Sequence, residues 1–139
     1  MAKRAQKNRI ERDSMGEMEV PPHVVYGAST QRAVLNFPIS GKTVPPAVIH
    51  AFALLKRSAA VANLKLAYLD QRRAKLIVQA CDEVLDSFES PEDAAEMMQH
   101  FPIDVFQTGS GTSTNMNMNE VLSNIVCLNT GNHIGAKDT

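Results

Sequence analysis

The segment from Gln107 to Glu120 contains the residue types best suited to hold an anion. It reads QTGSGTSTNMNMNE, with glycines at 109 and 111 and hydroxyl side chains around them. Glycine lets the backbone approach a ligand closely or adopt a positive φ, and hydroxyl groups donate hydrogen bonds. The segment also leads into a predicted helix, where free N–H groups and the helix dipole favour negative charge. These features predict a site for a carboxylate or a phosphate, and the sequence does not choose between the two.

Two common phosphate-binding motifs do not fit this segment. A P-loop requires a lysine directly after its last glycine, and Thr112 follows Gly111 here. The dinucleotide fingerprint requires a third glycine where Thr114 stands, and a preceding parallel strand that the sequence does not predict. Nucleotide binding is therefore disfavoured. One alternative is that the Ser, Thr and Asn side chains only cap the helix that begins near Thr114.

Other polar residues are weaker candidates for chemistry. The histidines show no metal-ligand spacing with one another or with a cysteine, so no metal site is predicted; they are His23, His50, His100 and His133. Arg32 lies in a stretch flanked by glycines and has two interpretations, a partner for a dicarboxylate or a surface salt bridge. Glu92 and Asp93 open a predicted helix, where they favour the dipole rather than form an acid and base pair.

Local signals predict the elements that must position this segment. A turn at Ser14–Gly16 predicts a hairpin over 9–20, and the stretch 27–41 is rich in turns. Apolar spacing predicts a helix from Pro45 and Pro46 to about Leu69. The inner face of that helix is predicted to hold Val48, Phe52, Leu55, Ala59 and Ala62. Three further helices are predicted, one from Asp70 to about Phe88, one from Ser90 to about His100, and one from about 112–115 to Gly131.

The chain of 139 residues is predicted to form one mostly α domain with a short β-hairpin near its start. The net charge of −1 disfavours nucleic acid and anionic membrane surfaces as partners, and no uninterrupted apolar run approaches the ~20 residues that span a bilayer. Residues 1–8 are predicted to be a basic flexible tail, which lacks the apolar block of a secretory signal. Two cysteines within apolar helical patterns are typical of a reducing compartment. The basic tail is short and poor in serine for a mitochondrial transit peptide, which favours the cytoplasm over the mitochondrion.

The segment 107–120 resembles the first of three signature segments of class II fumarases, which belong to the fumarase/aspartase superfamily. Other parts of the chain resemble further stretches of that family; they are 9–16, 20–21, 27–33, 37–40 and 101–105. Essentially every residue after about Asn8 fits the resemblance.

This resemblance implies the reversible hydration of fumarate to (S)-malate, a step of the tricarboxylic acid cycle, without a metal or an organic cofactor. On the family pattern Ser110, Gly111 and Thr112 hold a carboxylate of a small dicarboxylate substrate. Candidates for a supporting role are Thr108, Asn115, Asn117 and Arg32. The resemblance also implies that the catalytic groups lie in the other two signature segments. Residues 9–139 are then the N-terminal lyase domain, truncated before the central helical domain through which the family forms homotetramers.

Two alternatives stay open. Aspartases are ammonia lyases of the same superfamily and usually have Gly-Gly-Ala-Gly-Thr-Ser in the corresponding loop, where this chain has Ser110 in place of the alanine. That difference favours hydration over deamination. The second alternative is a non-catalytic interaction module, in which the apolar faces of the second and fourth predicted helices bind a partner rather than each other.

Overall fold

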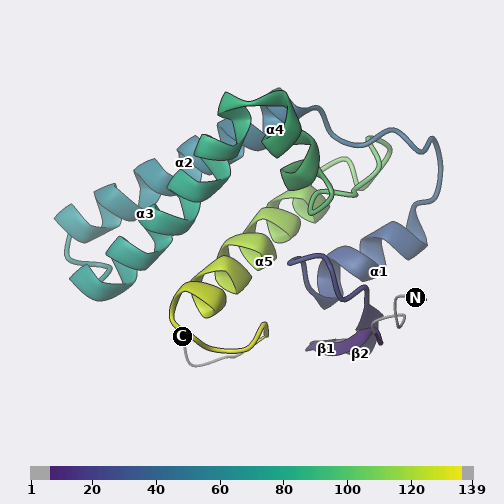
Figure 1. Cartoon of the computed structure of the whole chain (residues 1–139), viewed down its shortest axis with the longest axis horizontal. Coiled ribbons are helices and arrows are strands. Elements are labelled where there is room, and N and C mark those ends of the chain that lie inside the picture. Colours follow the sequence, from purple (N-terminus) through teal and green to yellow (C-terminus); the bar gives the residue numbers. More distant parts are fainter. Residues whose placement is uncertain (1–6, 136–139) are drawn as a thin grey trace, which may run out of the picture.

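The computed structural model describes residues 7–135 and is mostly α-helical, as predicted. Its elements are β1 (Arg9–Asp13), β2 (Gly16–Val20), α1 (Ala28–Asn36), α2 (Pro46–Lys65), α3 (Gln71–Asp86), the short 3₁₀ turn η1 (Ser87–Glu89), α4 (Pro91–Met98) and α5 (Thr112–Asn129). Helices α2 and α3 run side by side, and α5 lies between this pair and the unit formed by α1 and the hairpin (Figure 1). The predicted tail over residues 1–8 lies mostly outside the described residues, which include only its last two positions.

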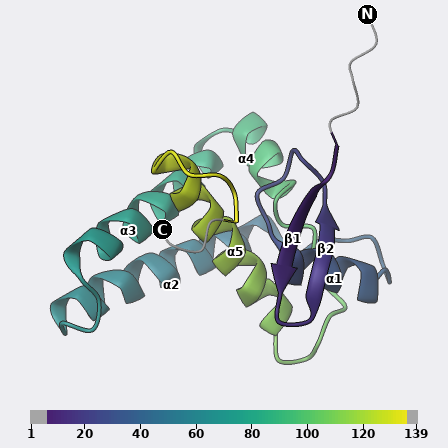
Figure 2. The same ribbon diagram turned by 90° about the horizontal axis from the view of Figure 1, so that it is seen from below.

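The hairpin of β1 and β2 is confirmed, with Asp13 paired to Gly16 across the turn. The inward side chains of β1 are charged, whereas those of β2 include apolar residues of the core. Arg9 donates to the carbonyl oxygens of Pro21 (2.7 Å) and Val24 (2.5 Å), which fixes the chain that leaves β2. The hairpin therefore packs through both polar and apolar contacts, and it lies next to α1 (Figure 2).

The start signals of α3 and α4 are confirmed. The Asp70 carboxylate accepts a hydrogen bond from the N–H of Arg73 (2.9 Å), and the Ser90 hydroxyl accepts one from the N–H of Asp93 (3.1 Å). Both contacts are N-caps, formed by residues within three positions of each other. Such short-range signals are visible in the sequence alone.

The predicted inner face of α2 is confirmed at Phe52, which packs against the core, and is wrong at the other predicted positions. Ile49, Ala53 and Ala60 are buried, whereas Leu55 is 61% exposed. The helix is apolar on almost every side, so its spacing does not determine which side faces the core. It also ends at Lys65 rather than near Leu69.

The faces of α3 and α5 pack against each other in one core. Buried members of this core include Cys81 and Val84 from α3 and Val121 and Ile125 from α5. These two faces are thus covered within the chain, which argues against the interaction-module alternative. Of the described helices, only α2 is long and apolar enough to cross a membrane by length and composition, two criteria that core helices of soluble proteins also meet.

Helix α1 was not predicted, because its N-terminus is capped by a residue far away in the sequence. Gly27 provides no side-chain cap. Instead, the carboxylate of Glu120 on α5 accepts hydrogen bonds from the N–H groups of Gly27 (3.0 Å), Ser29 (2.8 Å) and Thr30 (3.0 Å). This contact satisfies N–H donors that the start of a helix leaves unpaired. The residues around position 28 contain no local pattern that predicts it.

Asp104 anchors the chain just before the glycine-containing segment. Its carboxylate accepts hydrogen bonds from the N–H groups of Ser40 (2.7 Å), Gly41 (2.9 Å) and Phe106 (2.8 Å), and from the Ser40 hydroxyl (2.9 Å). Desolvation by burial opposes ionisation of Asp104, but these hydrogen bonds outweigh it and lower its pKa to about 2. Asp104 therefore joins the loop before α2 to the loop before α5.

We expect Asp104 to make the stability of the chain depend on pH in the acid range. Because its pKa is lowered from 3.8 to about 2 in the folded state, the unfolded chain takes up a proton first as the pH falls. The stabilisation is fully present above pH 3.8 and is lost as the pH falls to about 2. Urea unfolding at a series of pH values should show a shallower acid decline for Asp104→Asn than for the unchanged chain. Parallel curves would contradict this assignment, and the exposed Asp86→Asn serves as the control.

Candidate functional site

The loop before α5 presents hydroxyl groups at the start of a long helix. Gly111 adopts a left-handed conformation (φ 70°) and its N–H bonds to the carbonyl oxygen of Thr108 (3.0 Å). Ser110 and Thr112 are exposed, and their hydroxyl oxygens lie 2.8 Å apart. The Thr108 hydroxyl lies 3.5 Å from that of Ser110. The structure thus brings together the hydroxyl groups that the sequence selected.

These hydroxyl groups are not used to cap α5. The N-cap residue is Gly111, and the side chain of Gln107 makes the capping contact. Gln107 Oε1 accepts from the N–H of Thr114 (3.0 Å), and Gln107 Nε2 donates to the Thr114 hydroxyl (2.7 Å). Within residues 7–135, the hydrogen bonds of the Ser110 and Thr112 hydroxyls are those within the loop. The capping alternative therefore does not describe Ser110, Thr112 or Thr114, because the capping side chain is that of Gln107.

The loop is suited to an anion and has no general base of its own. The first N–H groups of a helix have no intrahelical acceptor, and the helix dipole makes this end positive. Hydroxyl and amide donors placed here can bind a carboxylate without adding a charged side chain. The histidines for which contacts are described are engaged elsewhere: His100 Nδ1 accepts from the N–H of Val25 (3.4 Å), and His50 packs edge-on against Phe88.

The supporting candidates have different positions. Asn117 is buried and donates to the carbonyl oxygen of His100 (2.9 Å), so it holds α5 to the chain that follows α4. Asn115 lies in the first turn of α5, where its Oδ1 accepts from Lys56 Nζ (2.6 Å). Arg32 donates to Asp13 through Nε (3.1 Å) and Nη2 (2.8 Å). The structure thus shows the salt-bridge alternative for Arg32, and its guanidinium group lowers the pKa of Asp13.

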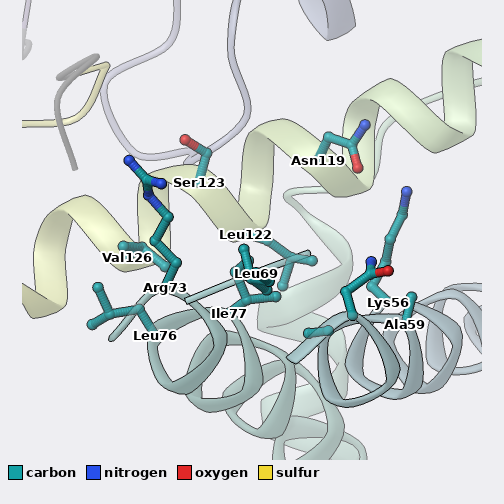
Figure 3. Close-up of a pocket in the computed structure, with 12 residues that line it drawn as sticks. Lys56, Ala59, Leu69, Arg73, Leu76, Ile77, Asn119, Leu122, Ser123 and Val126 are labelled. Atoms are coloured by element: carbon teal, nitrogen blue, oxygen red, sulfur yellow. The ribbon is translucent and has the colours of Figure 1, made fainter. Parts of the chain in front are cut away.

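A groove of about 440 Å³ lies between α2, α3 and α5. Its floor is apolar and includes Leu122 and Ile77. Figure 3 shows Lys56 and Asn119 at one end of the groove and Arg73 and Ser123 at the other. The side chain of Lys56 also contacts the first turn of α5, through Asn115. Within the described range 7–135, no three His, Cys, Asp or Glu side chains form a group that could hold a metal ion.

Comparison with known proteins identifies the family. Residues 16–137 match the protein family described as lyase. The chain belongs to this lyase family. It is 48% identical over 130 residues to "Fumarate hydratase class II 2" of Pseudomonas aeruginosa, covering 94% of this chain and 27% of the relative. It is also 48% identical over 127 residues to the class II fumarate hydratase of Halobacterium salinarum, covering 91% of this chain and 25% of the relative.

Solved structures agree with the sequence comparison. The recombinant class II fumarase from Schistosoma mansoni superimposes with a TM-score of 0.82 at 35% identity, over 94% of this chain and 26% of that one. The fumarate lyase:delta crystallin from Brucella melitensis gives a TM-score of 0.80 at 40% identity, over 92% of this chain and 28% of that one. The resemblance to class II fumarases is confirmed. The lyase chain spans about a quarter of the length of these relatives.

The sequence analysis missed the contacts that Gln107, Lys56 and Glu120 make around this loop. Gln107 is seven residues from Thr114, too far for the usual capping rules. Lys56 and Asn115 are 59 positions apart. Glu120 was placed in the signature segment, but its contacts with the start of α1 span at least 90 positions. A single sequence carries no signal for such pairs.

Proposed function

We propose that this chain is the N-terminal part of a fumarate hydratase and supplies one carboxylate-binding segment of its active site. The observation that carries the proposal is the pair of exposed hydroxyls, Ser110 and Thr112, 2.8 Å apart at the start of α5 and not used as caps. The named relatives are class II fumarate hydratases, and this supports fumarate and (S)-malate as the substrates. The same proposal includes homotetrameric assembly, a cytoplasmic location and catalysis without a cofactor.

The arrangement suits the chemistry of this reaction. In the direction from malate, a proton leaves the carbon beside one carboxylate and the hydroxyl leaves the neighbouring carbon as water. Removal of the proton places additional negative charge on that carboxylate. Neutral donors fixed in advance stabilise developing charge without the cost of reorganisation. Ser110, Thr112 and the first N–H groups of α5 supply such donors, and the proton acceptor belongs to another segment.

The test uses a fused enzyme, in which the 139-residue chain is joined to the part of the Pseudomonas aeruginosa relative that it does not match. Thr112→Val keeps the shape of the side chain and removes its hydroxyl group. Loss of one hydrogen bond to a charged group costs about 1.5–3 kcal/mol, so we expect kcat/KM to fall about ten- to a hundredfold. Thr43→Val, the same change at an exposed site, serves as the control. Unchanged kinetics in Thr112→Val would rule out a contact with substrate.

We also expect the fused enzyme to hydrate fumarate and to leave L-aspartate unchanged. The reason is Ser110, which adds a hydroxyl group where the aspartase loop has a methyl group. Fumarate formed from aspartate absorbs in the ultraviolet, so the two substrates are compared in one spectrophotometric assay. Release of ammonia at a rate similar to that of malate dehydration would favour the aspartase alternative.

A further inference from the structure

Lys56 is an unusual neighbour for the first turn of α5. It is half-buried on α2, and its ammonium group donates to Asn115 Oδ1 over 2.6 Å. Within residues 7–135, the ion pairs formed by lysine and arginine do not include Lys56, so no described carboxylate neutralises its charge. The nearby helix end is itself positive, and a cation there is unfavourable unless an anion is also present.

The contact with Lys56 determines how the Asn115 amide is oriented. An ammonium group has only donors, so it can bind Oδ1 and not Nδ2. The two N–H groups of Nδ2 are therefore left for another acceptor, and residues 7–135 provide none within hydrogen-bond distance. Asn115 lies three residues after Thr112, a spacing that makes the two side chains neighbours on the helix surface. Its backbone N–H also bonds to the Gly111 carbonyl oxygen (3.2 Å), which joins it to the same turn.

We propose that Lys56 is a positioning residue of the carboxylate site, which acts by orienting Asn115 and by adding positive charge at the first turn of α5. This inference rests on the proposed function and extends it to a residue outside the signature segment. The anion it favours is a substrate dicarboxylate, because the charge of the ligand offsets both the ammonium group and the helix end. Lys56 also lines the groove of Figure 3, so its side chain joins the groove to the loop.

The test measures KM and kcat separately in the fused enzyme. A charge that attracts the substrate equally before and during reaction changes KM and leaves kcat nearly constant. We expect Lys56→Gln to raise KM for fumarate by about tenfold, which corresponds to one charge-assisted contact, and to change kcat by less than about twofold. Lys56→Arg keeps the charge and a donor, and it should restore KM to within about threefold. Lys65→Gln removes a charge from the end of the same helix and should leave both constants unchanged.

A double-mutant cycle separates positioning from general electrostatics. If Lys56 acts through Asn115, the Lys56→Gln change should have a smaller effect in the Asn115→Ala background than in the unchanged enzyme, because only the contribution of the charge is left to lose. Additive effects, an unchanged KM in Lys56→Gln, or a loss confined to kcat would each overturn the inference. Thermal unfolding of every variant separates loss of fold from loss of binding. Activity of the unchanged fused enzyme and the Thr112→Val result test the proposed function independently of Lys56.

Discussion

The 139-residue chain alone is expected to convert no measurable fumarate to malate, even at high protein concentration. It spans about a quarter of the length of its relatives and contains only the first of the three signature segments that the family resemblance implies. The proposed carboxylate contacts lie within this chain, but the two histidines with described contacts, His50 and His100, are engaged elsewhere. His100 is held by Val25, and desolvation by burial lowers its pKa. Loss of orientation and of general acid–base catalysis each lowers the rate by orders of magnitude.

Nuclear magnetic resonance of the chain incubated with fumarate measures the product directly. A trace of enzyme from the expression host would also form malate, so the control is the Thr112→Ala chain prepared in the same way. Turnover that is equal in both preparations identifies the host enzyme. Turnover in the unchanged chain that disappears in Thr112→Ala would show that the chain contains a complete site, contrary to the proposal.

The accuracy of the sequence predictions depended on the distance over which each contact forms. The hairpin turn, the Asp70 cap of α3 and the Ser90 cap of α4 each involve residues no more than a few positions apart, and all three are confirmed. Helix α1 was missed because its cap, Glu120, lies on α5. Most of the predicted inner face of α2 was wrong because apolar residues occur around almost the whole helix, so only packing against the rest of the protein selects one side.

In the candidate site, too, features formed by residues close in the sequence were predicted and contacts between distant residues were not. The loop around Gly111 was found because its residue types and its position before a helix are local features. The orientation of the site depends on contacts from other elements, through Lys56 on α2 and through the Asp104 contacts with the loop before α2. These contacts require the tertiary structure. Sequence therefore identified what could bind the anion but not what holds the binding groups in place.

Glu120→Ala is expected to be the most destabilising single change considered for this chain. It removes the acceptor for three backbone N–H groups at the start of α1, and a buried donor left without a partner is costly. We expect the free energy of unfolding to fall by about 3 kcal/mol, measured by urea denaturation. Glu120→Gln retains one acceptor oxygen and should lose about half as much. The exposed Gln79→Ala, in the middle of α3, should change stability by less than about 0.5 kcal/mol.

The space around Gly27 allows the Glu120 contact to be tested a second way. A Cβ atom added at Gly27 would lie 3.0 Å from Glu120 Cδ, and the backbone of Gly27 is otherwise compatible with alanine. The carboxylate is held by three hydrogen bonds, so it cannot move aside without losing some of them. Gly27→Ala should therefore destabilise the chain strongly, but less in the Glu120→Ala background, where only Glu11 Oε2, 3.2 Å from the added Cβ atom, still crowds it. Equal effects in both backgrounds would mean that Glu120 does not hold the start of α1, and that α1 is positioned against α5 by apolar packing instead.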